Sequence, residues 1–115
     1  MLNIDGVEPK VWKTHEETGT SFLIKPVEPK DAQRLLKQAR DKKTGELDNV
    51  KYNGLAADHM IVEWKGVGAS GVETSCTSET KIKFGERFGR IVSFLMDHAT
   101  DMKMFSDEAE AGKND

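Results

Sequence analysis

An amphipathic segment toward the C-terminal end of the chain constrains the fold more than any other feature. It begins at Thr77-Ser78-Glu79-Thr80, which approximates a helix capping box, and it extends to Ala99. Its apolar side chains recur at helical spacings: Phe84, Phe88, Ile91, Val92, Leu95, Ala99 and Met102. Burying four large side chains of this kind contributes roughly 6–12 kcal/mol before conformational entropy is counted. We therefore expect the centre of the core here, in a short helix, a kink or turn near Gly85 and a longer helix from about Glu86.

The segment that precedes it can be interpreted in two ways. Helical spacing relates Leu55, Asp58, His59 and Val62, whereas Met60, Val62 and Trp64 alternate as in a strand. Its length favours a helix, because strands seldom run much beyond about 10 residues. We predict a helix over residues 53–64 that stops at Lys65-Gly66, and then a surface loop over residues 67–76.

The first part of the chain predicts a hairpin and a helix. Two β-prone runs, residues 11–15 and 21–27, flank a turn that contains Gly19. Pro29 then opens a helix that should end near Asp41, with one apolar stripe formed by Ala32, Leu35, Leu36 and Ala39. The predicted fold class is α+β, mainly α, with an N-terminal β-hairpin followed by three to four helices packed as a small bundle. One globular domain over residues 11–102 would lie between a partly ordered lead-in, residues 1–10, and a flexible polar tail, residues 103–115.

Charge and cysteine content narrow the class of protein. The 115-residue chain has a net charge of −3, with its lysines and arginines dispersed, which argues against a dedicated nucleic-acid binder. Cys76 is the single cysteine, so it forms no intrachain disulfide, and a reducing cytoplasmic compartment is the simplest fit. No signal-peptide pattern is visible, and no apolar run approaches the ~18–20 residues of a membrane span. We expect a soluble cytoplasmic protein with neither a nucleic acid nor a membrane as its partner.

Candidate catalytic groups are few and scattered. His59 follows Asp58, and His98 follows Asp97, so the two steps could approach each other if their helices paired antiparallel. A small enzyme or ligand-binding domain that uses His59 and His98 is therefore one alternative, although polar positions at the margin of a helix pair explain them more simply. Cys76 lies in no recognised cysteine-hydrolase signature, and the glycine-rich residues 66–71 lack the ending of a phosphate-binding loop. We predict a protein that is not an enzyme, without catalytic residues, cofactor or metal.

A family resemblance rests on three short motifs. They are Ile61-Val62-Glu63-Trp64-Lys65-Gly66-Val67, a loop that contains Gly71, and Thr77-Ser78-Glu79-Thr80-Lys81-Ile82 before the amphipathic helix. Together they resemble the small tail assembly chaperones of long-tailed bacteriophages and prophages. Two positions depart from that pattern: Ser70 stands where an acidic residue precedes the glycine, and Thr80 stands where asparagine is common.

The resemblance implies a non-enzymatic assembly factor that binds the tape-measure protein and tail-tube subunits in the cytoplasm of the bacterial host. Such chaperones are mostly helical and tend to form homo-oligomers. Aromatic and methionine side chains are favoured at protein interfaces. We therefore expect partner contacts at Trp64, Phe88, Met96, Met102 and Phe105, although core packing is the simpler role for Trp64. A structural tail or head–tail completion protein is the nearest alternative.

Overall fold

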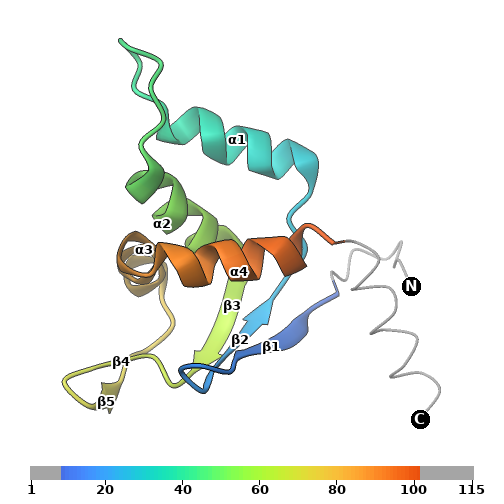
Figure 1. Cartoon of the computed structure of the whole chain (residues 1–115), viewed down its shortest axis with the longest axis vertical. Helices are drawn as coiled ribbons and strands as arrows, with labels where there is room; N and C mark the ends of the chain where they lie inside the picture. Colours follow the sequence, from blue (N-terminus) through green and yellow to red (C-terminus); the bar gives the residue numbers. More distant parts are fainter. Residues whose placement is uncertain (1–8, 102–115) are drawn as a thin grey trace.

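A three-stranded antiparallel sheet and four helices form the described part of the chain, residues 9–101, in this computed structural model (Figure 1). The sheet strands are β1 (Val11–His15), β2 (Thr20–Ile24) and β3 (Ile61–Lys65), and a short ribbon is formed by β4 (Gly68–Ala69) and β5 (Val72–Glu73). The helices are α1 (Pro29–Ala39), α2 (Asn49–Met60), α3 (Ser78–Arg87) and α4 (Gly89–Ala99). The predicted α+β class is confirmed. The predictions for the tail, and for all of the lead-in except Pro9 and Lys10, lie outside the described residues.

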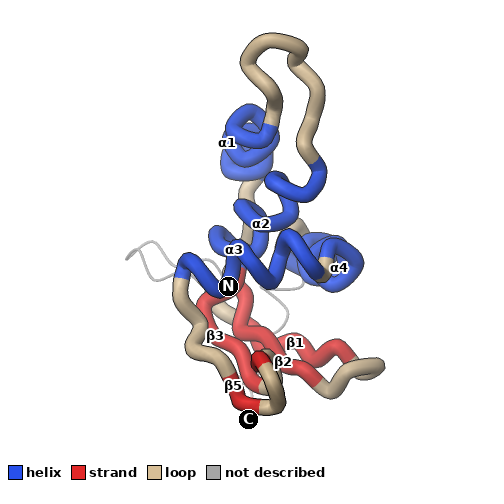
Figure 2. Tube along the Cα trace, turned by 90° about the vertical axis from the view of Figure 1, so that its left-hand side faces the viewer, coloured by secondary structure: helices blue, strands red, loops and turns tan. Residues whose placement is uncertain are grey.

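The sheet has the order β1-β2-β3, with β2 in the centre. Trp12 pairs with Leu23 across the first two strands, and Phe22 pairs with Trp64 across the second and third. Successive side chains of a strand point to opposite faces, and along β2 the buried residues are alternate ones, from Thr20 to Ile24. Figure 2 shows the helices grouped on one side of the sheet, which is where the buried face of β2 finds its packing partners.

The core lies between the sheet and the helices. Its fully buried large side chains are Phe22, Ile24, Val27, Met60, Ile61, Val92 and Leu95. Helix α2 is central, because it contacts α1, α3 and α4. Two backbone hydrogen bonds tie the segment between β2 and α1 to helix ends, from Lys25 to the Met60 carbonyl and from Val27 to the Ala99 carbonyl.

The predicted helix over residues 53–64 is wrong over its last four residues, 61–64. Helix α2 begins earlier, at Asn49, where the Asp48 side chain accepts a hydrogen bond from the Lys51 backbone N–H, and it ends at Met60. Residues 61–65 form strand β3 instead, because β2 offers an edge on which Ile24 and Phe22 pair with Ile61 and Trp64. A buried strand partner thus outweighs a local pattern that fits both structures.

The predicted pair of helices with a break between them is present, but the break lies at Phe88 and not near Gly85, which lies inside α3. A Cβ atom on Gly85 would collide with the Asn53 carbonyl and would lie 2.8 Å from the Gly54 Cα. Gly85 is therefore required for the close approach of α3 to α2, and not for a bend. The longer helix correspondingly starts at Gly89 and not at Glu86.

The predicted surface loop over residues 67–76 contains the β4–β5 ribbon. Its two-residue turn is Ser70-Gly71, and both residues have positive φ angles, 53° and 80°, as in a type I′ hairpin turn. Among the described residues, no helix has the length and hydrophobicity needed to cross a membrane.

Candidate functional site

A small apolar pocket lies where the ribbon meets helix α3. Its volume is about 200 Å³, and its lining consists of Trp64, Val67, Gly68, Thr74, Thr80, Lys83, Phe84, Arg87 and Phe88. Strand β3, the ribbon, helix α3 and Phe88, which follows that helix, therefore contribute to one concave surface. We call it the aromatic pocket.

The inner wall of the pocket belongs to a chain of aromatic rings that runs from the core to the surface. Phe84 is central, with its ring centroid 5.3 Å from that of Phe22, 5.6 Å from that of Trp64 and 5.3 Å from that of Phe88. These separations fall in the favourable range for aromatic pairs. Phe22 is fully buried, whereas Phe88 is 42% exposed. Packing thus holds the wall rigidly at its inner end and presents an apolar ring to solvent at its outer end.

Trp64 joins the sheet to the ribbon side of the pocket. Its indole Nε1 donates a 2.7 Å hydrogen bond to the Thr74 carbonyl, and the residue is only 4% exposed. The Thr74 backbone N–H in turn donates to the Val67 carbonyl at 2.8 Å. A buried indole N–H needs such an acceptor. This bond ties the ribbon to β3 together with the one that the Gly66 backbone N–H donates to the Glu73 carboxylate, at 2.7 Å.

Two cationic side chains of α3, Lys83 and Arg87, line the pocket. The Arg87 guanidinium lies 5.7 Å from the centroid of the Phe88 ring, within the distance of a cation–π contact. The Lys83 ammonium lies 3.2 Å from a Glu79 carboxylate oxygen, and both side chains are largely exposed. The surroundings of the pocket therefore combine an apolar floor with positive charge.

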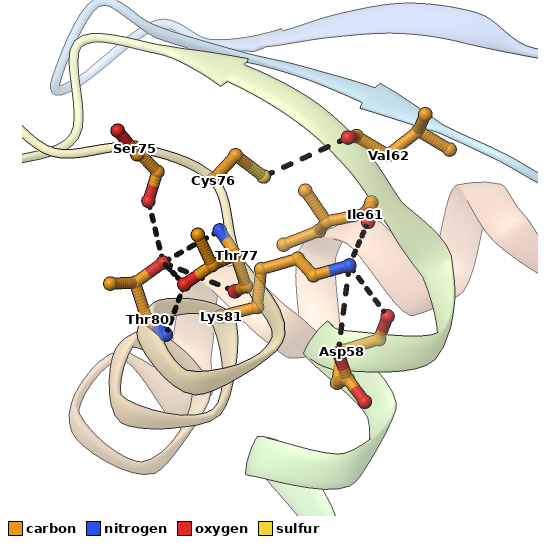
Figure 3. Close-up of polar contacts among 8 residues, drawn as sticks. All are labelled: Asp58, Ile61, Val62, Ser75, Cys76, Thr77, Thr80 and Lys81. Carbon is orange, nitrogen blue, oxygen red and sulfur yellow. Dashed lines mark hydrogen bonds and ion pairs between the residues drawn. The ribbon is translucent and has the colours of Figure 1, made fainter.

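Helix α3 is held in place by hydrogen bonds at its first turns, which Figure 3 shows. Thr77 caps the helix, and Thr80 completes the capping box by accepting from the Thr77 backbone N–H at 2.9 Å. The Thr80 hydroxyl donates to the Ser75 carbonyl at 2.6 Å. The predicted cap is confirmed, and threonine at position 80 performs the reciprocal role that glutamate or glutamine has in the usual box.

Lys81 connects α3 to the end of α2, as Figure 3 also shows. Its ammonium donates to the carbonyls of Asp58 and Ile61, at 3.1 and 2.9 Å, and lies 3.5 Å from the Asp58 carboxylate. A cation at a helix C-terminus satisfies carbonyls that have no partner within the helix. Lys81 thereby fixes α3, and the pocket wall on it, against the point where α2 passes into β3.

Cys76 has the surroundings of a structural thiol. Its Sγ is half-buried and donates to the Val62 carbonyl at 3.8 Å. Burial raises the pKa of the thiol above its ordinary value, and the nearby Lys81 only partly opposes this. A raised pKa lowers the thiolate fraction at neutral pH, which is the opposite of what a nucleophile needs.

The structure brings together two of the five residues predicted to contact a partner. Trp64 and Phe88 both line the aromatic pocket, Trp64 as a buried core residue and Phe88 as its exposed outer ring. Met96 lies on α4, packed partly buried against the core, and does not line this pocket. Met102 and Phe105 lie outside the described residues.

The two Asp-His dipeptides, Asp58-His59 and Asp97-His98, place their histidines against different residues. His59 Nε2 lies 3.6 Å from an Asp31 carboxylate oxygen on α1, and its Nδ1 lies 3.4 Å from the Arg34 guanidinium. The His98 ring makes an edge contact with Phe94, with 4.9 Å between the centroids. Within residues 9–101, no three His, Cys, Asp or Glu side chains are grouped so that they could hold a metal ion.

Phe84, Lys83 and Arg87 were not predicted as site residues. In the sequence Phe84 belongs to the apolar face of the last helices, and Lys83 and Arg87 belong to the dispersed lysines and arginines. The signal was available in part, since Phe84 and Phe88 are four residues apart and such pairs meet on a helix.

Comparisons of this chain with protein-family models, with curated proteins and with solved structures found no match.

Proposed function

We propose that this chain is a non-enzymatic binding protein that holds an apolar side chain of a partner protein in the aromatic pocket. The observation that carries the proposal is the pocket itself, with a half-exposed Phe88 at its mouth and buried Trp64 and Phe84 behind it. Its volume of about 200 Å³ is below the ~300–1,000 Å³ of most small-molecule sites. A single large side chain of a protein suits such a space better than a substrate or cofactor does.

The family resemblance suggests which partner to test first. A tail assembly chaperone binds the tape-measure protein and tail-tube subunits in the bacterial cytoplasm, and long helical tape-measure segments offer many apolar side chains. An exposed aromatic ring backed by rigid aromatic neighbours is the kind of anchor that dominates protein interfaces. The proposal includes self-association of the chain, which size-exclusion chromatography with light scattering would detect.

The test is co-purification of the full chain with fragments of a tape-measure protein, compared between the wild type and Phe88→Ala. Loss of an interface anchor costs about 2 kcal/mol, which is roughly a 30-fold loss of affinity. Val50→Ala is the matched control, because Val50 is 53% exposed and does not line the pocket. Equal binding by both variants would contradict the pocket as the contact site, and no binding by the wild type would contradict the partner. Recovery of the chain from purified phage particles would favour the structural component over the chaperone.

A further inference from the structure

A second concave surface lies at the opposite end of α2 from strand β3, between that helix, the end of α1 and the loop that joins them. It is an open hollow of about 820 Å³ lined by Lys37, Gln38, Arg40, Asp41, Lys42, Lys43, Lys51 and Leu55. Five of these residues are cations and one is an acid, in a chain whose net charge is −3. We call it the basic hollow. Figure 1 shows the loop that joins α1 and α2 at the top, away from the β4–β5 ribbon at the bottom.

The loop between α1 and α2, which carries Lys42 and Lys43, is stabilised by hydrogen bonds among its own residues. An Asp41 carboxylate oxygen accepts from the backbone N–H groups of Lys43 and Thr44, at 2.8 and 2.9 Å. The Asp41 backbone N–H donates to the Glu46 carbonyl, and the Arg40 guanidinium donates to the Gly45 carbonyl at 3.0 Å. Arg40 and Asp41 therefore serve the loop, and the four lysine ammonium groups remain for a ligand.

Ion pairing within the fold does not account for these lysines. Among residues 9–101, no carboxylate lies within ion-pair distance of Lys37, Lys42, Lys43 or Lys51. Lys37 lies in the last turn of α1, where a cation is favourable. Lys51 lies in the first turn of α2, where the helix dipole disfavours a positive charge. Helix stability therefore cannot explain why a lysine faces the hollow at position 51.

The geometry points to an acidic segment of a partner protein, rich in aspartate and glutamate, as the ligand of the basic hollow. Lysine ammonium groups on flexible stems act as point charges, which suits separate carboxylates along a peptide. Single-stranded nucleic acids are held by cations together with aromatic side chains on which the bases stack. The lining of the hollow contains no aromatic residue, and its single apolar member is Leu55. These observations favour a peptide over a nucleic acid.

The inference goes beyond the proposed function, because the hollow and the aromatic pocket share no lining residue. A partner that used both sites would present an apolar anchor and, separately, an acidic stretch. Complementary charge of this kind accelerates encounter and adds specificity.

The test measures fluorescence anisotropy of a labelled peptide of alternating aspartate and glutamate, titrated with the full chain at low ionic strength. The triple variant K37E/K42E/K51E should weaken binding by about tenfold or more, because each reversal turns an attraction into a repulsion. The control K10E/K30E/K65E makes the same change of charge with lysines that do not line the hollow, and it should weaken binding by about twofold at most. K42E/K43E, confined to exposed loop positions, replaces the triple variant if circular dichroism shows that the triple variant has not folded.

Three outcomes would overturn the inference. The wild type could fail to bind the peptide, both sets of reversals could weaken it equally, or an oligothymidylate of equal charge could bind more tightly to the same lysines. The last outcome would assign the hollow to nucleic acid. Phe88→Ala should leave the affinity for the acidic peptide unchanged, so failure of this inference is distinguishable from failure of the proposed function.

Discussion

Helix α2 meets α3 and α1, two of the three helices that it contacts, in opposite ways. Toward α3 the backbones approach closely at Gly54 and Gly85, and Lys81 binds the last carbonyls of α2. Toward α1 the contact along the helices is made by a few buried side chains and the Asp31–His59 pair. At its end, where the Asp48 backbone N–H donates to the Ala39 carbonyl, it opens into the basic hollow. On the α3 side of α2 the two helix backbones are in direct contact. On the α1 side the two helices are held together along their length by side chains.

The difference between the two contacts indicates which side of α2 stabilises the fold and which side offers a surface for a ligand. A backbone contact cannot relax when an atom is added, so the α2–α3 pair should tolerate little change. Long charged side chains at the α1–α2 end have room to move and remain partly solvated, which suits a ligand surface and contributes little to stability. The aromatic pocket lies on the rigid side, and we expect it to be preorganised.

The largest effect is expected from Gly85→Ala, which should lower the free energy of unfolding by about 2–3 kcal/mol, because the added methyl group would collide with the backbone of Asn53. Urea unfolding followed by circular dichroism measures it. Gly89→Ala is the matched control, since its Cβ would meet only the movable amide end of Asn53, at 2.6 Å, and it should cost less than about 1 kcal/mol. A loss as small for Gly85 as for Gly89 would contradict the description of the α2–α3 contact.

Lys81→Met should cost about 1.5–2 kcal/mol, because it removes charged hydrogen bonds to two carbonyls in a side chain that is only 15% exposed. The same unfolding measurement applies. Lys83→Met, two residues away on the exposed face, should change stability by less than about 0.5 kcal/mol. Similar losses for the two variants would show that Lys81 does not cap α2.

On the other side of α2, Asp31→Asn should cost about 0.5–1 kcal/mol at neutral pH. The substitution removes a carboxylate that pairs with His59 and Arg34, and it removes a favourable acid from the first turn of α1. Thermal unfolding of this variant beside Lys81→Met compares the two helix contacts directly. A loss from Asp31→Asn that equals the loss from Lys81→Met would remove the contrast between them.

The smallest effect concerns the loop beside the basic hollow. Backbone hydrogen bonds from Thr44 and Lys43 hold the pKa of Asp41 below its ordinary value of 3.8. Because the folded pKa is depressed, this stabilisation is complete above the unfolded value and is lost as the pH falls through the folded one. Amide hydrogen exchange at Lys43 and Thr44 should therefore lose protection under acidic conditions before the amides of α2 do, and Asp41→Asn should abolish that pH dependence. Simultaneous loss of protection in the loop and in α2 would contradict a separate loop transition.

Sequence patterns predicted the local elements well where a single interaction decides them. Pro29 opens α1, and Thr77 caps α3, because these preferences act within one helical turn. Of the predicted contact residues, Trp64 and Phe88 were indicated by residue type alone. Their meeting in one pocket could not be predicted, because 23 residues of strand, ribbon and helix separate them.

The sequence by itself determined the α+β class, the apolar faces of α1, α3 and α4, the start of α1 at Pro29 and the cap of α3 at Thr77, because these local features depend on neighbours within a few residues along the chain. Only the tertiary structure decided that residues 61–65 form a strand, since that choice depends on an edge of β2 located some forty residues earlier. The same is true of Gly85, which would weaken an isolated helix and is required where α3 crosses α2. Tertiary structure likewise gathers lysines that are dispersed along the chain into the basic hollow, because the loop between α1 and α2 brings Lys37 and Lys51 to the same surface.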